Sequence, residues 1–271
     1  MKIGVAMRNM GTQSSGEMMG QCALAAESAG LDSIWITDHI AIPPDDAEGS
    51  GGRYTETLTT LAWLGGLTTR IAIGAGVLIL PYREKLITAK QVATIQELTG
   101  GRLLLGVGIG WMDAEFRAVG VNRHRRGVIS DTTLEFLNDC FANEVVSAHG
   151  QEFLFKPRPV KPPVLVGGRA PHALDRAARL ADGWLPMARN AASLAEPIAQ
   201  YRQMTSALDR PHGQVVALTR LPLENTEEAQ AQLAQYRELG VDAVVSSVSY
   251  DSSAEFTDAV GALSQFIDSG A

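Results

Sequence analysis

Short apolar segments alternate with longer amphipathic segments along the whole chain, and this alternation constrains the fold more than any other feature. Strand patterns cover residues 2–7, 32–37, 71–78, 102–109, 164–167, 183–187, 215–219 and 242–246. Helical patterns follow them at residues 17–29, 57–67, 84–98, 125–141, 171–181, 192–208, 226–239 and 254–267. Strands that alternate with helices pair in parallel, and eight such units favour closure into a (β/α)8 TIM barrel. A doubly wound open sheet is the alternative.

Length and composition favour a single domain. The chain has 271 residues, of which 45% are hydrophobic, and α/β barrels of this size commonly form one domain. We therefore interpret residues 1–271 as one barrel. Residues 43–54 are polar and glycine-rich and follow a strand pattern, which predicts a mobile lid on the face where barrel enzymes carry their sites. Residues 149–163 hold four prolines and predict an inserted hairpin or loop.

The charge pattern and the cysteines exclude several classes of protein. The net charge is −7, and no basic surplus of the kind that binds nucleic acid is present. No apolar run reaches the ~18 residues that span a membrane, and the N-terminus begins in a strand pattern rather than a signal peptide. The only cysteines, Cys22 and Cys140, have no metal-type spacing, so we expect reduced packing residues. We expect a cytoplasmic protein with no bound metal.

A glycine pair between a strand and a helix is a candidate anion site. The apolar run 164–166 ends in Gly167 and Gly168, and Pro171 stands where a first helical residue is expected. Bare backbone N–H groups at a helix N-terminus attract phosphate, and Arg169 adds a charged donor. An ordinary tight turn is the alternative interpretation.

Three longer segments carry a resemblance to a known family. They are AAESAGLDSIWITDHI (25–40), IAIGAGVLILPYREKLITAKQVATIQELTGGRLLLGVGIGW (71–111) and PPVLVGGRAPHALDRAARLADGW (162–184). The sequence resembles the luciferase-like monooxygenase superfamily, and within it the coenzyme F420-dependent oxidoreductases. The resemblance implies a (β/α)8 barrel that binds a flavin-type cofactor. Coenzyme F420 is the expected cofactor and FMN is the alternative.

The resemblance implies roles for the pair that ends the second strand pattern. Asp38 and His39 would lie beside the cofactor ring. Histidine transfers protons near neutral pH, so His39 is the candidate acid or base. Asp38 would bond the cofactor or fix the tautomer of His39. In the structural alternative, Asp38 caps a loop and His39 is a buried side chain with satisfied hydrogen bonds.

The resemblance also implies positions that line the cofactor. A cis peptide bond is expected at Gly76–Val77, in a bulge behind the ring. Ile109, Gly110 and Trp111 would lie along the ring or its ribityl chain. Some sugar-phosphate dehydrogenases of this branch have an acidic residue at the position of Trp111, so its replacement here argues against a sugar-phosphate substrate. Trp111 would provide an apolar wall or cover the barrel rim.

The phosphate of the cofactor is expected at Gly167, Gly168 and Arg169. A basic run, Arg123–Arg126, opens a helical pattern and could attract a polyglutamyl cofactor tail, although a solvated helix face is the simpler interpretation.

These expectations define one main hypothesis for the function and two alternatives. The first is hydride transfer between the deazaflavin and an unidentified small organic substrate, apolar or weakly polar, in a homodimer like those of similar enzymes. The second is an FMN-dependent monooxygenase. The third is a cofactor-binding barrel without turnover.

Overall fold

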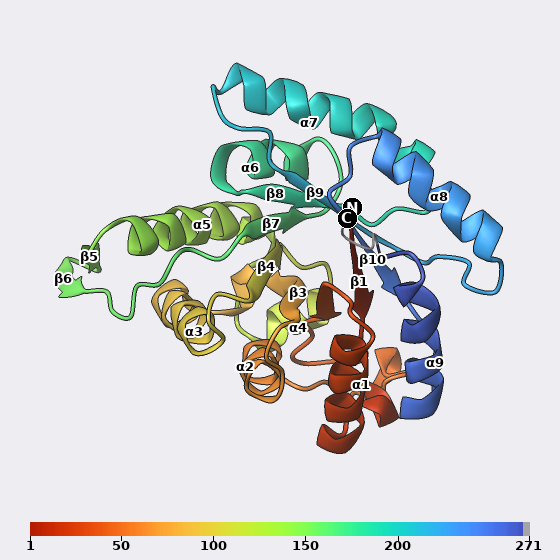
Figure 1. Ribbon diagram of the computed structural model, residues 1–271. Coiled ribbons are helices and arrows are strands. Elements are labelled where there is room, and N and C mark those ends of the chain that lie inside the picture. Colours follow the sequence, from red (N-terminus) through yellow and green to blue (C-terminus); the bar gives the residue numbers. More distant parts are fainter. Residues whose placement is uncertain (268–271) are drawn as a thin grey trace.

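Eight parallel strands form a closed barrel in the computed structural model, which describes residues 1–267 (Figure 1). Around the barrel the order is β1-β10-β9-β8-β7-β4-β3-β2, and β2 pairs with β1 to close it. The barrel strands are β1 (Lys2–Ala6), β2 (Ser33–Ile36), β3 (Ala72–Ile79), β4 (Leu103–Gly108), β7 (Val164–Gly167), β8 (Gly183–Leu185), β9 (Gln214–Thr219) and β10 (Ala243–Ser247). The predicted (β/α)8 barrel is confirmed, and the open sheet is excluded. The predicted domain 1–271 includes residues 268–271, which lie outside the described residues.

A helix follows each barrel strand and covers its outer face. These helices are α1 (Gly16–Ser28), α2 (Thr57–Leu67), α3 (Lys85–Leu98), α5 (Arg126–Ala142), α6 (His172–Leu180), α7 (Ala195–Ala207), α8 (Thr226–Glu238) and α9 (Ser253–Ser264). A further helix of 6 residues, α4 (Asp113–Ala118), lies between β4 and α5, and the sequence patterns did not predict it.

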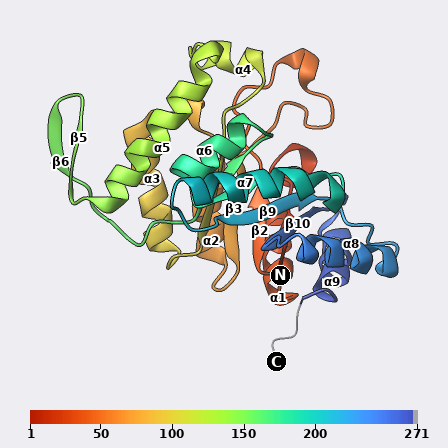
Figure 2. The same ribbon diagram turned by 90° about the horizontal axis from the view of Figure 1, so that it is seen from above.

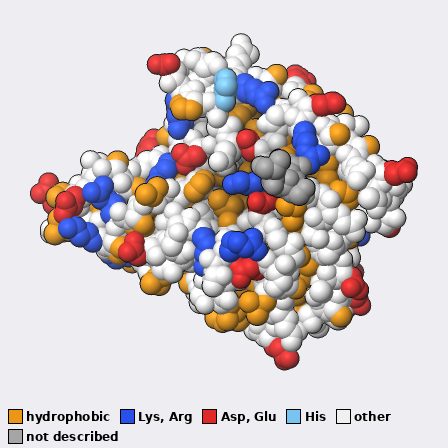
Figure 3. All heavy atoms as spheres, viewed as in Figure 1, with side chains coloured by type: hydrophobic (Ala, Val, Ile, Leu, Met, Phe, Trp, Pro, Cys, Tyr) orange, Lys and Arg blue, Asp and Glu red, His pale blue; other side chains and the backbone are white. Residues whose placement is uncertain are grey.

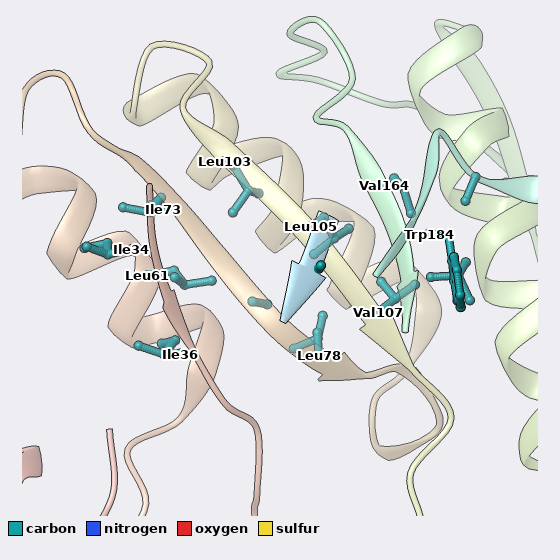
Figure 4. Close-up of a cluster of buried hydrophobic side chains, with 14 of the residues drawn as sticks. Ile34, Ile36, Leu61, Ile73, Leu78, Leu103, Leu105, Val107, Val164 and Trp184 are labelled. Atoms are coloured by element: carbon teal, nitrogen blue, oxygen red, sulfur yellow. The ribbon is translucent and has the colours of Figure 1, made fainter. Parts of the chain in front are cut away.

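The period of two along each strand divides the apolar side chains into two cores. Residues that point inward, such as Trp35 and Leu165, form the cluster that fills the barrel. Residues that point outward, such as Ile34 and Leu105, pack against the helices (Figure 4). The alternation therefore tells which residue at the end of a strand faces the interior.

Three aspartates hold the N-terminal ends of neighbouring strands together. Asp32, Asp182 and Asp242 each precede a barrel strand, and each accepts the backbone N–H of a residue at the start of the adjacent strand. The donors are Ile3 at 2.8 Å, Val164 at 2.9 Å and Val215 at 2.7 Å. The same bond thus ties β1 to β2, β7 to β8 and β9 to β10. This end of the barrel is built for stability.

Two insertions depart from the regular units. β5 (Val145–Ala148) and β6 (Gln151–Leu154) form an antiparallel hairpin that projects away from the barrel (Figures 1 and 2). The hairpin begins before the predicted range 149–163, because His149 and Gly150 form its turn. Residues 43–54 follow β2 and lie beside α4 (Figure 2). A groove of about 320 Å³ between them is lined by Pro43, Asp46 and Trp111.

The surface has no strong segregation of charge on the face that Figure 3 shows, where acidic and basic side chains are interspersed. Cys22 and Cys140 are buried and unpaired, as predicted. Among residues 1–267, no helix is long and apolar enough to cross a membrane.

Candidate active site

Asp38 and His39 lie two and three residues after the end of β2 and have different hydrogen-bond partners. Trp35 of β2 points into the barrel, whereas Ile34 and Ile36 belong to the core between strands and helices. Among the described residues, no hydrogen bond joins the carboxylate of Asp38 to the ring of His39.

Asp38 is a framework residue with several bonds. Its carboxylate is buried and accepts the hydroxyl of Thr57 at 2.8 Å and the N–H of Ile79 at 2.7 Å. Arg83 donates to both of its oxygens, at 2.6 and 2.8 Å, and also to Glu56 at 2.9 Å. Burial lowers the pKa of Arg83, but the bonds to Asp38 and Glu56 outweigh it and raise the pKa above its usual value. Asp38 therefore ties β2 to α2 and β3.

The carboxylate that contacts His39 belongs to Glu115. One oxygen of Glu115 lies 3.0 Å from Nδ1 of His39 and accepts the hydroxyl of Tyr82 at 3.0 Å. The other accepts the N–H groups of Ile40 at 2.6 Å and Ala41 at 3.0 Å. Burial raises the pKa of Glu115, but the bonds from Ala41 and Ile40 and the nearby His39 lower it more, so the net shift is downward. An ionised carboxylate only accepts hydrogen bonds, so Nδ1 of His39 carries a proton and Nε2 is left for a ligand.

Glu115 was missed because α4 was missed. The resemblance draws attention to position 111, where some relatives have an acid and this chain has Trp111. A carboxylate does reach the site, but it belongs to Glu115 of α4. Glu115 is 1% exposed, although the charged residues around it resemble a solvated helical turn. A helix this short has no measurable periodicity, so only its position after β4 could have indicated it.

Two aromatic side chains flank the ring of His39. The ring centroid of Tyr54 lies 4.8 Å away and that of Trp111 lies 6.2 Å away. Trp111 is 66% exposed, so it stands at the rim rather than inside the barrel. The side chain of His39 is 20% exposed, which makes it accessible from the mouth.

Val77 forms part of the floor of the mouth. The Gly76–Val77 peptide bond is cis, as the resemblance implied, and the register between β3 and β4 shifts there. A Cβ at Gly108 would lie 2.5 Å from one methyl group of Val77, and a Cβ at Gly167 would lie 2.6 Å from the other. These two glycines thus provide space for Val77.

Gly110 has a local structural reason to be glycine. Its φ is +74°, and a Cβ there would lie 2.9 Å from Ile79 and 3.0 Å from Phe116. Ile109 is half-buried beside it. The chain here turns from β4 toward α4, so these residues lead to Glu115.

The segment after β7 offers an open helix N-terminus. Gly168 has φ +123° and is exposed, as are Arg169 and Ala170. Among residues 1–267, the backbone N–H groups of Arg169 and Ala170 donate to no acceptor. Pro171 is the N-cap of α6 rather than its first helical residue, and no side chain caps this end. An anion fits these conditions.

The basic run lies near this helix. Arg123 is in a 3-10 turn, and α5 begins at Arg126. Arg176 of α6 donates to the carbonyl of Gly127 at 3.4 Å, so the start of α5 lies beside α6. The Nε atoms of Arg123 and Arg126 are buried, and neither has a hydrogen-bond partner among the described residues. Nη1 of Arg126 donates to the carbonyl of Arg123 at 3.1 Å, and among the described residues neither arginine forms a salt bridge.

A closed parallel barrel with a histidine–carboxylate pair and an uncapped helix at its mouth has the features of a (β/α)8 enzyme. No group of three His, Cys, Asp or Glu in residues 1–267 could hold a metal. The model of the family described as "Luciferase-like monooxygenase" matches residues 1–267. The chain belongs to this family of oxidoreductases and monooxygenases.

Relatives in sequence include two uncharacterized proteins and a reductase. One uncharacterized protein of Mycobacterium tuberculosis is 36% identical over 181 residues, which is 60% of this chain and 62% of that protein. A second is 30% identical over 255 residues, which is 86% of this chain and 88% of that protein. The 5,10-methylenetetrahydromethanopterin reductase of Methanolobus tindarius is 29% identical over 60% of this chain and 48% of its own length.

Solved structures share the fold. A monooxygenase from Streptomyces bottropensis has a TM-score of 0.82 at 17% identity, with 98% of both chains covered. An F420-dependent secondary alcohol dehydrogenase, in complex with an F420-acetone adduct, has a TM-score of 0.80 at 14% identity and the same coverage. A diketocamphane monooxygenase of Pseudomonas putida with bound FMN has a TM-score of 0.79 at 12% identity, with 98% and 97% covered. The neighbours thus include F420 and FMN proteins.

Proposed function

We propose that this protein is an F420-dependent oxidoreductase that transfers hydride between the deazaflavin and a small organic substrate. The closeness of the segments at 25–40, 71–111 and 162–184 to the deazaflavin branch supports F420. The observation that carries the enzymatic role is the bond between buried Glu115 and Nδ1 of His39, whose side chain is 20% exposed.

The residues after β7 fit the phosphate of such a cofactor. The free N–H groups of Arg169 and Ala170, the dipole of α6 and the guanidinium of Arg169 would hold it. Arg123 and Arg126 would attract the anionic tail, which FMN lacks. When bound, the deazaflavin supplies a ring carbon that accepts or donates hydride.

The chain's own residues would handle the proton and exclude water. Nε2 of His39 would accept the proton of a substrate hydroxyl, or return it to a carbonyl in the reverse direction. Glu115 would stabilise the imidazolium that forms. Residues 43–54, with Tyr54 against His39, would cover the bound substrate as a lid.

The test is a titration of the apoprotein with F420 and with FMN side by side. We expect tighter binding of F420, and a larger loss of its affinity as salt rises, because salt screens charges exposed at the rim. Tighter binding of FMN at every salt concentration would overturn the choice of cofactor.

A matched pair of variants tests the phosphate site. Gly168→Val should weaken binding of the cofactor, since a side chain would crowd the backbone that receives the phosphate. Gly150→Val is the control, because Gly150 also has a positive φ, +79°, but lies in the β5–β6 turn. Equal cofactor affinity of the two variants would refute the site.

The FMN-dependent monooxygenase remains the second candidate, supported by the FMN-binding neighbour. It predicts oxygen consumption with reduced FMN, which a deazaflavin enzyme would not show. A barrel that binds cofactor without turnover would consume neither oxygen nor reducing equivalents with any substrate.

A further inference from the structure

Arg8 is a charged side chain at the barrel mouth that the proposed chemistry does not use. Gly4 and Ala6 of β1 face the barrel interior, where a Cβ at Gly4 would lie 3.3 Å from Trp35 and where Ala6 packs against the interior cluster. Arg8 lies two residues after the end of β1, where it would continue that inward series. It lies at the end of the barrel that carries His39.

The guanidinium of Arg8 lacks a counter-ion. Its Nε is buried without a hydrogen-bond partner among the described residues, and its Nη2 makes one long contact, 3.4 Å, to the carbonyl of Gly49. The two buried acids near the mouth are already occupied, Asp38 by Arg83 and Glu115 by His39. A buried donor without an acceptor is costly, so this group is suited to receive an anion from a ligand.

Arg8 lies on the side of His39 and away from the proposed phosphate site. β1 neighbours β2, whereas β7 is on the opposite side of the eight-stranded barrel. Tyr54 pairs with Met10 in an antiparallel bridge and contacts the ring of His39. Tyr54 therefore lies between the chain that carries Arg8 and the candidate acid or base. A ligand on Arg8 would be a substrate rather than the cofactor phosphate.

We propose that the substrate of this enzyme carries a carboxylate, which Arg8 binds while the reacting carbon lies beside His39. The proposal rests on the proposed function, since it assigns a substrate class to that site. One guanidinium matches the two oxygens of a carboxylate in a fork. A dianionic phosphate would need further donors, and those lie at β7. Such a substrate would still have the apolar body expected from the sequence, with a charged group at one end.

The test compares ketones that differ only in the carboxylate. Binding of 4-oxopentanoate and of 2-pentanone to the cofactor-loaded protein is measured by calorimetry. Two charge-assisted hydrogen bonds predict a preference of about 10- to 100-fold for 4-oxopentanoate. Arg8→Gln should abolish this preference without changing cofactor affinity. Arg8→Lys keeps the positive charge but loses the two parallel N–H donors of the guanidinium. It should therefore retain only part of the preference for 4-oxopentanoate.

Arg117→Gln is the control. Its side chain is 71% exposed and already pairs with Asp113 on α4, so the preference should remain. Equal binding of the two ketones by the wild type, or a preference that survives Arg8→Gln, would overturn the assignment. The titrations are repeated on the apoprotein. Failure to bind F420, with an intact Arg8-dependent preference, would refute the proposed function and leave the role of Arg8 standing.

Discussion

Replacing Glu115 by glutamine tests the relation between the buried carboxylate and His39. The substitution keeps the shape of the side chain and one carbonyl oxygen, which can still accept from Ile40 and Ala41. The other oxygen becomes an NH2 group that faces Nδ1 of His39 and the hydroxyl of Tyr82. An NH2 group donates, so Nδ1 must become the acceptor and the proton must move to Nε2.

The expected loss of stability follows from the bonds that change. Hydrogen bonds to charged groups contribute roughly 1.5–3 kcal/mol each and neutral ones roughly 0.5–1.5. Glu115 makes two side-chain bonds that lose their charge, to His39 at 3.0 Å and to Tyr82 at 3.0 Å. We therefore expect the free energy of unfolding to fall by about 2–3 kcal/mol, and the melting temperature by about 5–10 °C.

Nitrogen-detected NMR of the histidine rings is the decisive assay, because it needs no substrate. The sequence has 5 histidines, and His39→Gln identifies the signal of His39. At a pH where the ring is neutral, the wild type should show the Nδ1–H tautomer, and Glu115→Gln should show Nε2–H. Turnover should fall by about 10²–10⁴-fold in the variant. An Nε2–H tautomer in the wild type, or no change in the variant, would refute the reasoning.

Four further outcomes are expected. His39→Ala should reduce turnover by roughly 10²–10⁴-fold while cofactor affinity, measured by titration, is unchanged; near-normal turnover would leave His39 a structural residue. Because the pKa of Glu115 lies below its usual 4.5 in the fold, its contribution to stability is present above that pH and is lost as pH falls through the folded pKa. As pH is lowered, the free energy of unfolding of Glu115→Gln should therefore fall less steeply than that of the wild type. An equal fall in the two proteins would contradict this. Asp38→Ala should lower the free energy of unfolding by about 3–5 kcal/mol in urea, since it leaves buried Arg83 with Glu56 alone and removes the acceptor of the Ile79 N–H, and a loss under 1 kcal/mol would refute its framework role. Gly167→Ala should cost about 1–3 kcal/mol, and less in combination with Val77→Ala; additive costs would show that the two side chains do not compete for space.

The barrel could be predicted from the sequence because its signal is repeated in every strand–helix unit. The turn at Gly167–Gly168 and the cis bond at Gly76–Val77 were also expected, the latter only through the resemblance. Asp38 and His39 were both assigned to the cofactor ring, and this stays a prediction. Their partners Arg83 and Glu115 come from segments 45 and 76 residues away, which the sequence did not bring together.

Two residues of the proposed site were not indicated by the sequence. Glu115 is on a helix of 6 residues, too short to show a pattern, and its carboxylate is held by segments that follow β2 and β3, at His39–Ala41 and Tyr82. Arg8 follows a strand, and only the absence of an acid near it in space distinguishes it from a solvated arginine. Both observations depend on contacts between distant segments, and a single sequence does not show which segments meet.

The three aspartates at the N-terminal end of the barrel each join one strand to the strand that follows it in the chain. Asp32 ties the first pair, and Asp182 and Asp242 tie the last two, so the halves before and after the β5–β6 hairpin each have bonds of their own. His39 and Glu115 belong to the first half, and the helix end proposed to receive the phosphate belongs to the second. The residues proposed for proton transfer and the backbone proposed for the cofactor phosphate thus lie in halves with separate framework bonds, so a substitution that weakens one of these bonds leaves those of the other half in place.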